Sequence, residues 1–124
     1  MNNYGFLRTA ASSLKLKVAD ISFNTSAIKE AVDSAVSNDV RLLVTPELSI
    51  TGYTCADLFF TNVIIRQSER AVAELKDYIK DKNIVLVVGA PIPFFNKVYN
   101  CAVVIDKDGV KGIVPKKHLA NYNE

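Results

Sequence analysis

The sequence has few of the residues from which metal and redox sites are built. There is one histidine, His118, and there are two cysteines, Cys55 and Cys101, which do not form a C-x-x-C pair. A lone histidine gives no ligand set for a metal ion, and separated cysteines argue against a zinc knuckle or a thioredoxin-like motif. We expect packing roles for both cysteines in a reducing compartment, with one disulfide as the alternative.

Three other absences narrow the class of protein. Neither glycine-rich phosphate loop, G-x-x-x-x-G-K-[ST] or G-x-G-x-x-G, occurs, which disfavours a doubly wound nucleotide-binding domain. No apolar run approaches the roughly 20 residues that cross a bilayer, and the N-terminus has no apolar signal segment. The net charge is only +2, and the positive residues are scattered apart from a small cluster near the C-terminus. We therefore expect a cytoplasmic protein that binds neither membrane nor nucleic acid.

The first half of the chain predicts strands around one helix, within a single domain of 124 residues. Residues 6–12 and 14–20 read as extended, and residues 21–26 form a polar break before a helix. The candidate helix caps in that break are Asn24, Thr25 and Ser26. A continuous apolar run over residues 40–44 predicts a strand covered on both faces, which ends at Pro46. The apolar stripe of the intervening helix comprises Ile28, Ala31, Val32, Ala35 and Val36.

The second half predicts a longer helix followed by three strands. A helix of about five turns follows the loop after Pro46, and residues 83–93 form a second apolar strand closed by Gly-x-Pro. Residues 99–105 and 110–114 read as a hairpin around a Lys-Asp-Gly turn. The order of elements predicts an α/β layered domain whose site lies where strands end. The inner stripe of the second helix comprises Ile64, Ser68, Ala71, Val72, Leu75 and Ile79.

Three predicted strand ends carry residues of chemical interest. The first strand end presents Glu47, the second presents residues 89–91, and the third presents Lys116. A carboxylate and an ammonium on the same rim keep each other ionised. Such a pair can serve acyl transfer, because Glu47 can take a proton from a nucleophile and Lys116 can stabilise an oxyanion. Each residue alone is more typical of a solvated charge, and the nucleophile is missing.

Three stretches resemble the nitrilase, or carbon–nitrogen hydrolase, superfamily. They are "NNYGFLRTAASSLKLKVADISFN", "LLVTPELSITGYTCADLF" and "GIVPKKHLANYNE". The "PELSITGY" and "PKKHL" segments carry the superfamily match. The opening and the "GYTCADLF" loop are most similar to the N-terminal glutaminase domains of glutamine-dependent NAD⁺ synthetases. The resemblance covers nearly the whole chain.

The resemblance implies a Glu–Lys–Cys triad that releases ammonia from glutamine. By motif, Glu47 matches the general base and Lys116 the catalytic lysine, while Tyr53 and Tyr122 match positions that line the glutamine pocket. The nucleophilic cysteine of the family follows a later strand, so it is expected beyond residue 124. Cys55 is not expected to replace it, because it lies where the family has a variable residue. The 124 residues alone are then expected to be inactive, because triad members act as a unit.

The family also implies a fold and partners. Residues 1–124 would be the N-terminal part of an α/β domain, a partial αββα sandwich with a mixed sheet and helices on one face. Glutamine would be the partner here, with no cofactor. ATP, Mg²⁺ and nicotinic acid adenine dinucleotide would act in a separate synthetase domain of a homo-oligomer. A stand-alone nitrilase-type amidase and a non-catalytic α/β module that binds a partner through its open edge stay as alternatives.

Overall fold

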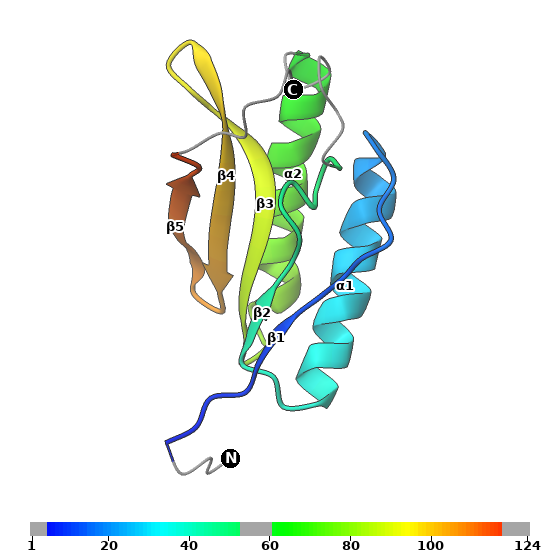
Figure 1. The fold of residues 1–124 in the computed structure, drawn as a ribbon, viewed down its shortest axis with the longest axis vertical. Helices are drawn as coiled ribbons and strands as arrows, with labels where there is room; N and C mark the ends of the chain where they lie inside the picture. The colour runs from blue at the N-terminus through cyan, green and yellow to red at the C-terminus, as the bar shows by residue number, and fades with distance from the viewer. Residues whose placement is uncertain (1–4, 53–60, 118–124) are drawn as a thin grey trace.

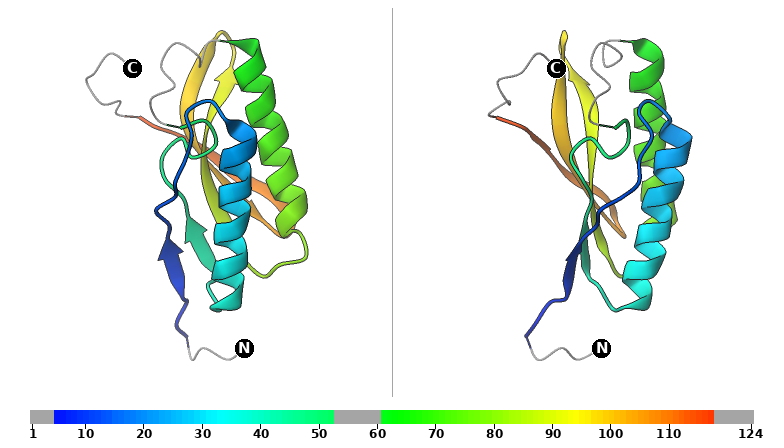
Figure 2. Two further views of the ribbon diagram at one scale, coloured as in Figure 1. Left: turned by 90° about the vertical axis from the view of Figure 1, so that its right-hand side faces the viewer. Right: turned by 45° about the vertical axis from the view of Figure 1, so that its right-hand side comes forward.

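The computed structural model describes residues 5–52 and 61–117. Within these residues the chain forms two helices and one five-stranded sheet with the strand order β1-β2-β3-β4-β5. The strands β1, β2 and β3 are parallel, whereas β4 and β5 are each antiparallel to the preceding strand. Both helices cover the same face of the sheet (Figures 1 and 2). The elements are β1 Thr9–Ala11, α1 Ile21–Ser37, β2 Leu42–Val44, α2 Asn62–Ile79, β3 Val85–Phe94, β4 Lys97–Asp106 and β5 Gly109–Pro115.

The core lies between the helices and the covered face of the sheet. Side chains alternate between the two faces of a strand, so every second residue of β3 and β4 points toward the helices. These residues meet the predicted apolar stripes of both helices, which confirms the mixed sheet with helices on one face. Val36 is the exception to the predicted stripe of the first helix, because it lies near the helix end and is 39% exposed. Large side chains that are completely buried in this core are Ile28, Val32, Leu75, Ile79, Leu86 and Ile105.

The opposite face of the sheet, called the open face below, is covered by no described helix or strand. Val44 at the end of β2 is 39% exposed, and Val114 near the end of β5 is 58% exposed. The apolar run of β2 predicted cover on both faces, but the described residues cover only one. In the parts of the chain that the structure describes, no helix is long and apolar enough to span a membrane.

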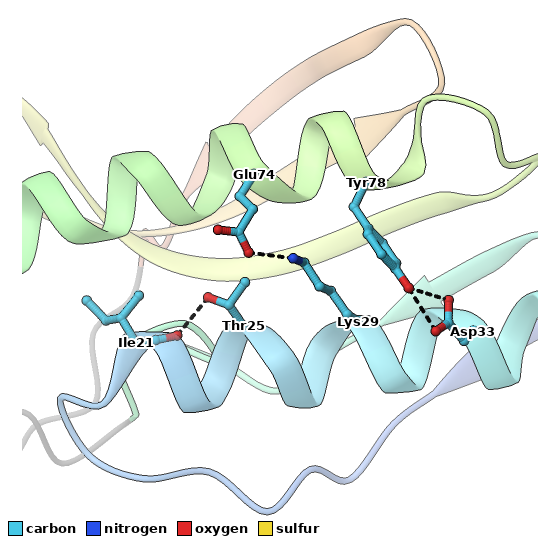
Figure 3. Close-up of polar contacts among 6 residues, drawn as sticks. All are labelled: Ile21, Thr25, Lys29, Asp33, Glu74 and Tyr78. Carbon is cyan, nitrogen blue, oxygen red and sulfur yellow. Dashed lines mark hydrogen bonds and ion pairs between the residues drawn. The ribbon is translucent and has the colours of Figure 1, made fainter.

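Polar contacts align the two helices along their outer edge (Figure 3). The Lys29 ammonium lies 2.6 Å from the Glu74 carboxylate, and the Tyr78 hydroxyl donates to both carboxylate oxygens of Asp33 at 2.7 and 2.8 Å. Exposed contacts of this kind contribute little to stability. They fix the alignment of α1 against α2, while the apolar stripe beneath them contributes most of the stability.

The predicted start of the first helix is wrong. Helix α1 begins at Ile21, and its cap is Asp20, whose side chain accepts a hydrogen bond from the Phe23 N–H at 3.0 Å. Asn24 is completely buried and is not a cap. Its amide instead bonds the backbone of Lys17, through N–H and C=O at 2.7 and 2.8 Å, and the Ile50 carbonyl at 3.0 Å. Residues 14–20, predicted to be extended, form no strand: they are a loop that the Asn24 amide holds against the start of α1.

The prediction that residues 89–91 stand at the end of the second apolar strand is also wrong. Strand β3 continues through residues 89–91 to Phe94 and pairs with β4 along its whole second half. The Val85 N–H and the carbonyls of Val87 and Gly89 point toward the β2 side of the strand. Pro91 has the same parity, so the N–H that it lacks is not needed by the ladder with β4. The glycine and prolines therefore lie within a long strand rather than at its end.

Candidate active site

Glu47 lies in a tight turn directly after β2. Pro46 ends the strand pairing, and Leu48 then adopts a left-handed backbone with φ of +51° although its side chain is buried. A leucine in this region is strained and persists only where its surroundings hold it. The turn closes through a hydrogen bond from the Gly52 N–H to the Leu48 carbonyl at 2.8 Å. Glu47 therefore projects from a fixed bend.

A chain of hydroxyl groups ties this turn to β3. The Thr45 hydroxyl donates to the Val87 carbonyl at 2.9 Å, and the Gly89 N–H donates to the Ser49 hydroxyl at 3.1 Å. The two hydroxyls are 2.8 Å apart. Since Thr45 uses its only hydrogen on a carbonyl, Ser49 must be the donor between them. Both side chains are buried, so the turn that carries Glu47 is braced from within.

The turn also packs directly on the backbone of β3. A Cβ atom at Gly89 would lie 2.2 Å from the Leu48 nitrogen and 2.9 Å from its Cα. Only glycine allows this close approach, because any side chain would collide with backbone rather than with a movable group. Gly89 is therefore required for the position of the Glu47 turn, which the sequence pattern did not predict.

Lys116 follows β5, which is separated from β2 by the two strands β3 and β4. Two reversals of direction, at the β3–β4 and β4–β5 connections, make β5 run the same way as β2. The carboxyl ends of β2 and β5 therefore lie at the same end of the sheet, where their side chains can meet. The Lys116 ammonium lies 2.9 Å from Glu47 Oε1, and the two side chains are 33% and 39% exposed. The structure thus brings together the two charged residues that the sequence singled out.

Asn100 completes the cluster. Its side-chain amide also donates to Glu47 Oε1, and its backbone carbonyl accepts a hydrogen bond from the Lys116 N–H at 2.8 Å. Sequence reasoning missed Asn100, because it appears as an ordinary polar position in an alternating strand. Only the strand register reveals its role: Asn100 lies opposite Pro91 on the open face, at the same end of the sheet as the Glu47 turn.

The electrostatics of the cluster favour an ionised carboxylate. The hydrogen bond from the Lys116 ammonium lowers the pKa of Glu47 below its ordinary value. Partial burial opposes this shift, whereas the Asn100 amide and the charge of Lys116 reinforce it. Glu47 is therefore negatively charged at neutral pH and can accept a proton.

A cleft of about 280 Å³ adjoins these three side chains on the open face. Most of its lining is apolar, and the charged pair is part of that lining. Its lining includes Val44, Val87, Ala102 and Val114 in addition to Glu47, Asn100 and Lys116. A mostly apolar cleft with a few convergent polar groups is typical of a small-molecule site.

The structure describes only one of the remaining residues that the sequence analysis considered. Tyr53, Cys55, His118 and Tyr122 lie outside the described residues. Cys101 is buried within β4, and that burial raises the pKa of its thiol. It pairs with Ala90, a residue of the helix-covered core, so its side chain lies on the opposite face of the sheet from Glu47. Cys101 therefore has the packing role that the sequence predicted.

Comparison with known proteins identifies the class. The sequence matches the carbon-nitrogen hydrolase family over residues 8–124. The chain therefore belongs to the carbon–nitrogen hydrolase family, as the sequence motifs predicted. A structure of an amidase from Nesterenkonia sp. superimposes with a TM-score of 0.84 at 26% identity, over 95% of this chain and 45% of that one.

Among its relatives are glutamine-dependent NAD⁺ synthetases. The chain is 33% identical over 121 residues to that enzyme of Mycobacterium tuberculosis, covering 98% of this chain and 18% of the relative. The structure of the synthetase from Cytophaga hutchinsonii superimposes with a TM-score of 0.82 at 30% identity, over 93% of this chain and 20% of that one. The chain thus spans about a fifth of the length of these relatives.

Proposed function

We propose that these residues form the first part of the glutaminase domain of a glutamine-dependent NAD⁺ synthetase. The observation that carries the proposal is the contact in the cleft lining between Glu47 and Lys116, which are 69 residues apart in the sequence. Similarity to synthetases along almost the whole chain supports glutamine as the substrate. The open, partly apolar face of the sheet is consistent with further strands that complete an αββα sandwich.

In the proposed reaction, Glu47 acts as the base for a cysteine outside these 124 residues. Glu47 takes the thiol proton, and the thiolate forms a bond to the side-chain amide carbon of glutamine. Lys116 stabilises the negative charge that develops on the amide oxygen. The carbon–nitrogen bond then breaks, and the proton held by Glu47 passes to the departing nitrogen, which leaves as ammonia.

The thioester that remains is cleared by water. Glu47 accepts a proton from the attacking water, the carbon–sulfur bond breaks, and the proton returns to the cysteine as glutamate leaves. Tyr53 and Tyr122 would line the glutamine pocket. The ammonia would serve amidation of nicotinic acid adenine dinucleotide with ATP and Mg²⁺, through residues that lie outside this chain, in a cytoplasmic homo-oligomer.

A stand-alone amidase is the second candidate. The similarity to the Nesterenkonia amidase, which covers 95% of this chain, supports it. Both candidates would use Glu47 and Lys116 in the same way, and they differ in whether ammonia release is coupled to a synthetase reaction. A glutamine-dependent formation of NAD⁺ by the full-length enzyme would favour the synthetase, whereas hydrolysis of simple amides without it would favour the amidase.

Replacement of Lys116 tests the proposal. In the full-length enzyme, Lys116→Met should reduce glutamine-driven turnover by about 10²- to 10³-fold, the usual cost of removing an oxyanion stabiliser. Turnover driven by added ammonia should be unchanged, because it bypasses the glutaminase step. Equal loss of both activities would contradict the assignment. The 124-residue chain alone should release no ammonia from glutamine, and measurable release would show that the nucleophile lies within it.

A further inference from the structure

Asn100 is the one uncharged side chain of the cluster that binds the Glu47 carboxylate. Asn100 Nδ2 and Lys116 Nζ both donate to the same oxygen, Oε1. Among residues 5–52 and 61–117, no side chain donates a hydrogen bond to the second oxygen, Oε2. The carboxylate is therefore held by one oxygen and leaves its other oxygen available to a reacting group.

Asn100 also holds the residue that shares this contact. Its backbone carbonyl accepts from the Lys116 N–H at 2.8 Å, directly after β5 ends. The same residue thus binds the side chain of Glu47 and the backbone of Lys116. Because Asn100 lies within the ten-residue strand β4, which pairs on both sides, its own position is fixed by the sheet. Both partners are positioned against a rigid element.

An amide suits this position better than a charged group. A second ammonium next to Lys116 would repel it, and a carboxylate would repel Glu47 and could not donate. The neutral amide adds a donor and no net charge. It restricts rotation of the carboxylate, which would otherwise be free to present either oxygen to either partner.

We propose that Asn100 is a positioning residue that binds Glu47 Oε1 and thereby directs Oε2 toward the proton of the nucleophile. This role rests on the proposed function, since it has meaning only if Glu47 is the base. Loss of the Asn100 contact would leave Lys116 as the sole described partner of a carboxylate that can rotate. Misplacement of a catalytic group by about 1 Å can cost about 10²-fold in rate.

The test uses Asn100→Leu and Asn100→Asp in the full-length enzyme. Glutamate release is measured across pH, so that kcat, KM and the acid limb of the profile are obtained. We expect kcat for glutamine to fall by about 10- to 100-fold in both variants with little change in KM. The acid limb should move to higher pH, and further for Asn100→Asp, because that variant replaces a donor by a negative charge.

The control is Tyr99→Phe. Tyr99 adjoins Asn100 in β4 but faces the other side of the sheet, and this variant should leave kcat and the pH profile unchanged. If Asn100→Leu does not fold, Asn100→Asp carries the same test, because it keeps the shape of the side chain. Thermal unfolding of each variant corrects the rates for the folded fraction.

Two results would overturn the proposal. One is an unchanged kcat in both variants. The other is a fall in kcat that merely matches the fall in folded protein, with the acid limb of the pH profile at its wild-type position. A Glu47→Gln variant separates this outcome from failure of the proposed function. If Glu47→Gln still hydrolyses glutamine, the proposed function fails and takes the role of Asn100 with it. If Glu47→Gln is inactive while the Asn100 variants match the wild type, only the positioning role is wrong.

Discussion

The two faces of the sheet differ in what their residues do. On the helix-covered face, Leu86 and Ile105 are completely buried in a continuous apolar core. On the open face, Val44 and Val114 are partly exposed and adjoin the charged contact between Glu47 and Lys116. One face therefore stabilises the fold, and the other presents a polar cluster on an apolar surface.

This difference shows how one sheet can keep its stabilising core apart from an accessible charged cluster. The Glu47 turn crosses from β2 onto the backbone of β3 and is fixed there by buried hydroxyls and by Gly89. Its strain is compensated by the packing beneath it. The cluster can therefore carry charge and remain accessible, because the opposite face provides the hydrophobic stabilisation.

The largest effect is expected from a cavity on the covered face. Leu86→Ala removes a completely buried side chain and should lower the free energy of unfolding by about 2–5 kcal/mol. Val114→Ala on the open face should change it by less than about 0.5 kcal/mol in the 124-residue chain. Urea denaturation of both variants measures the contrast. Both variants are measured at concentrations low enough to keep the chain monomeric, and similar losses would mean that the stabilising core is not on the helix-covered face.

A smaller effect is expected where the two regions touch. Gly89→Ala places a Cβ against the Leu48 backbone and should cost about 1–3 kcal/mol by overpacking, with displacement of the Glu47 turn. Gly112→Ala is the matched control, because a Cβ there meets nothing within 4 Å. Denaturation curves compare the two. Equal stability of the two variants would contradict the close approach of the turn to β3.

The open face should also drive self-association. Exposed apolar surface favours contacts between copies of the 124-residue chain, as do the outer sides of β1 and β5, which pair with no described strand. Val114→Lys should weaken that association by about tenfold or more, since burying a valine is worth about 1.5–3 kcal/mol. Sedimentation equilibrium measures the constant. A clean monomer for the unmodified chain at high concentration would count against this account.

The charged contact should add a small, pH-dependent stability. Because the pKa of Glu47 is lowered in the folded chain, its contribution is present above the ordinary value and is lost as pH falls through the lowered pKa. Exposure of both partners limits the contribution to about 0.2–1 kcal/mol. Glu47→Gln should therefore be slightly less stable than the wild type at pH 7 and equal to it in strong acid. A constant difference across pH would contradict this.

The smallest effect is expected on the outer edge of the helix pair. Asp33, hydrogen-bonded to the Tyr78 hydroxyl, raises the pKa of that tyrosine. The contact stabilises the protonated hydroxyl, so its contribution is complete below the unfolded pKa and is lost as pH rises through the raised one. Thermal melts in alkali should show this loss in the wild type and not in Tyr78→Phe. Identical pH dependence would show that the hydrogen bond is unimportant.

Much of the fold could be predicted from apolar spacing. Both helix stripes and the hairpin after residue 97 follow from periodicity, because burial selects one face of an element. The start of α1 could not be predicted, since Asp20 and Asn24 are both plausible caps until the loop that binds Asn24 is known. The extent of β3 was also hidden, because a proline ends a strand only if its nitrogen faces a partner.

The site was only half visible in the sequence. Glu47 and Lys116 stand out through their motifs, and the direction of the strands explains why they meet. Asn100 and Gly89 do not stand out, because their roles depend on register and on the close approach of two backbones. Long-range geometry of this kind is absent from local patterns.

The most direct test of the central claim compares two sources of nitrogen for Glu47→Gln in the full-length enzyme. Glutamine-driven and ammonia-driven NAD⁺ formation are measured side by side at neutral pH. If Glu47 is the base of a glutaminase site, glutamine-driven turnover is abolished and ammonia-driven turnover matches the wild type. Equal loss of both, or retention of glutamine-driven turnover, would contradict the account and make Glu47 a structural residue.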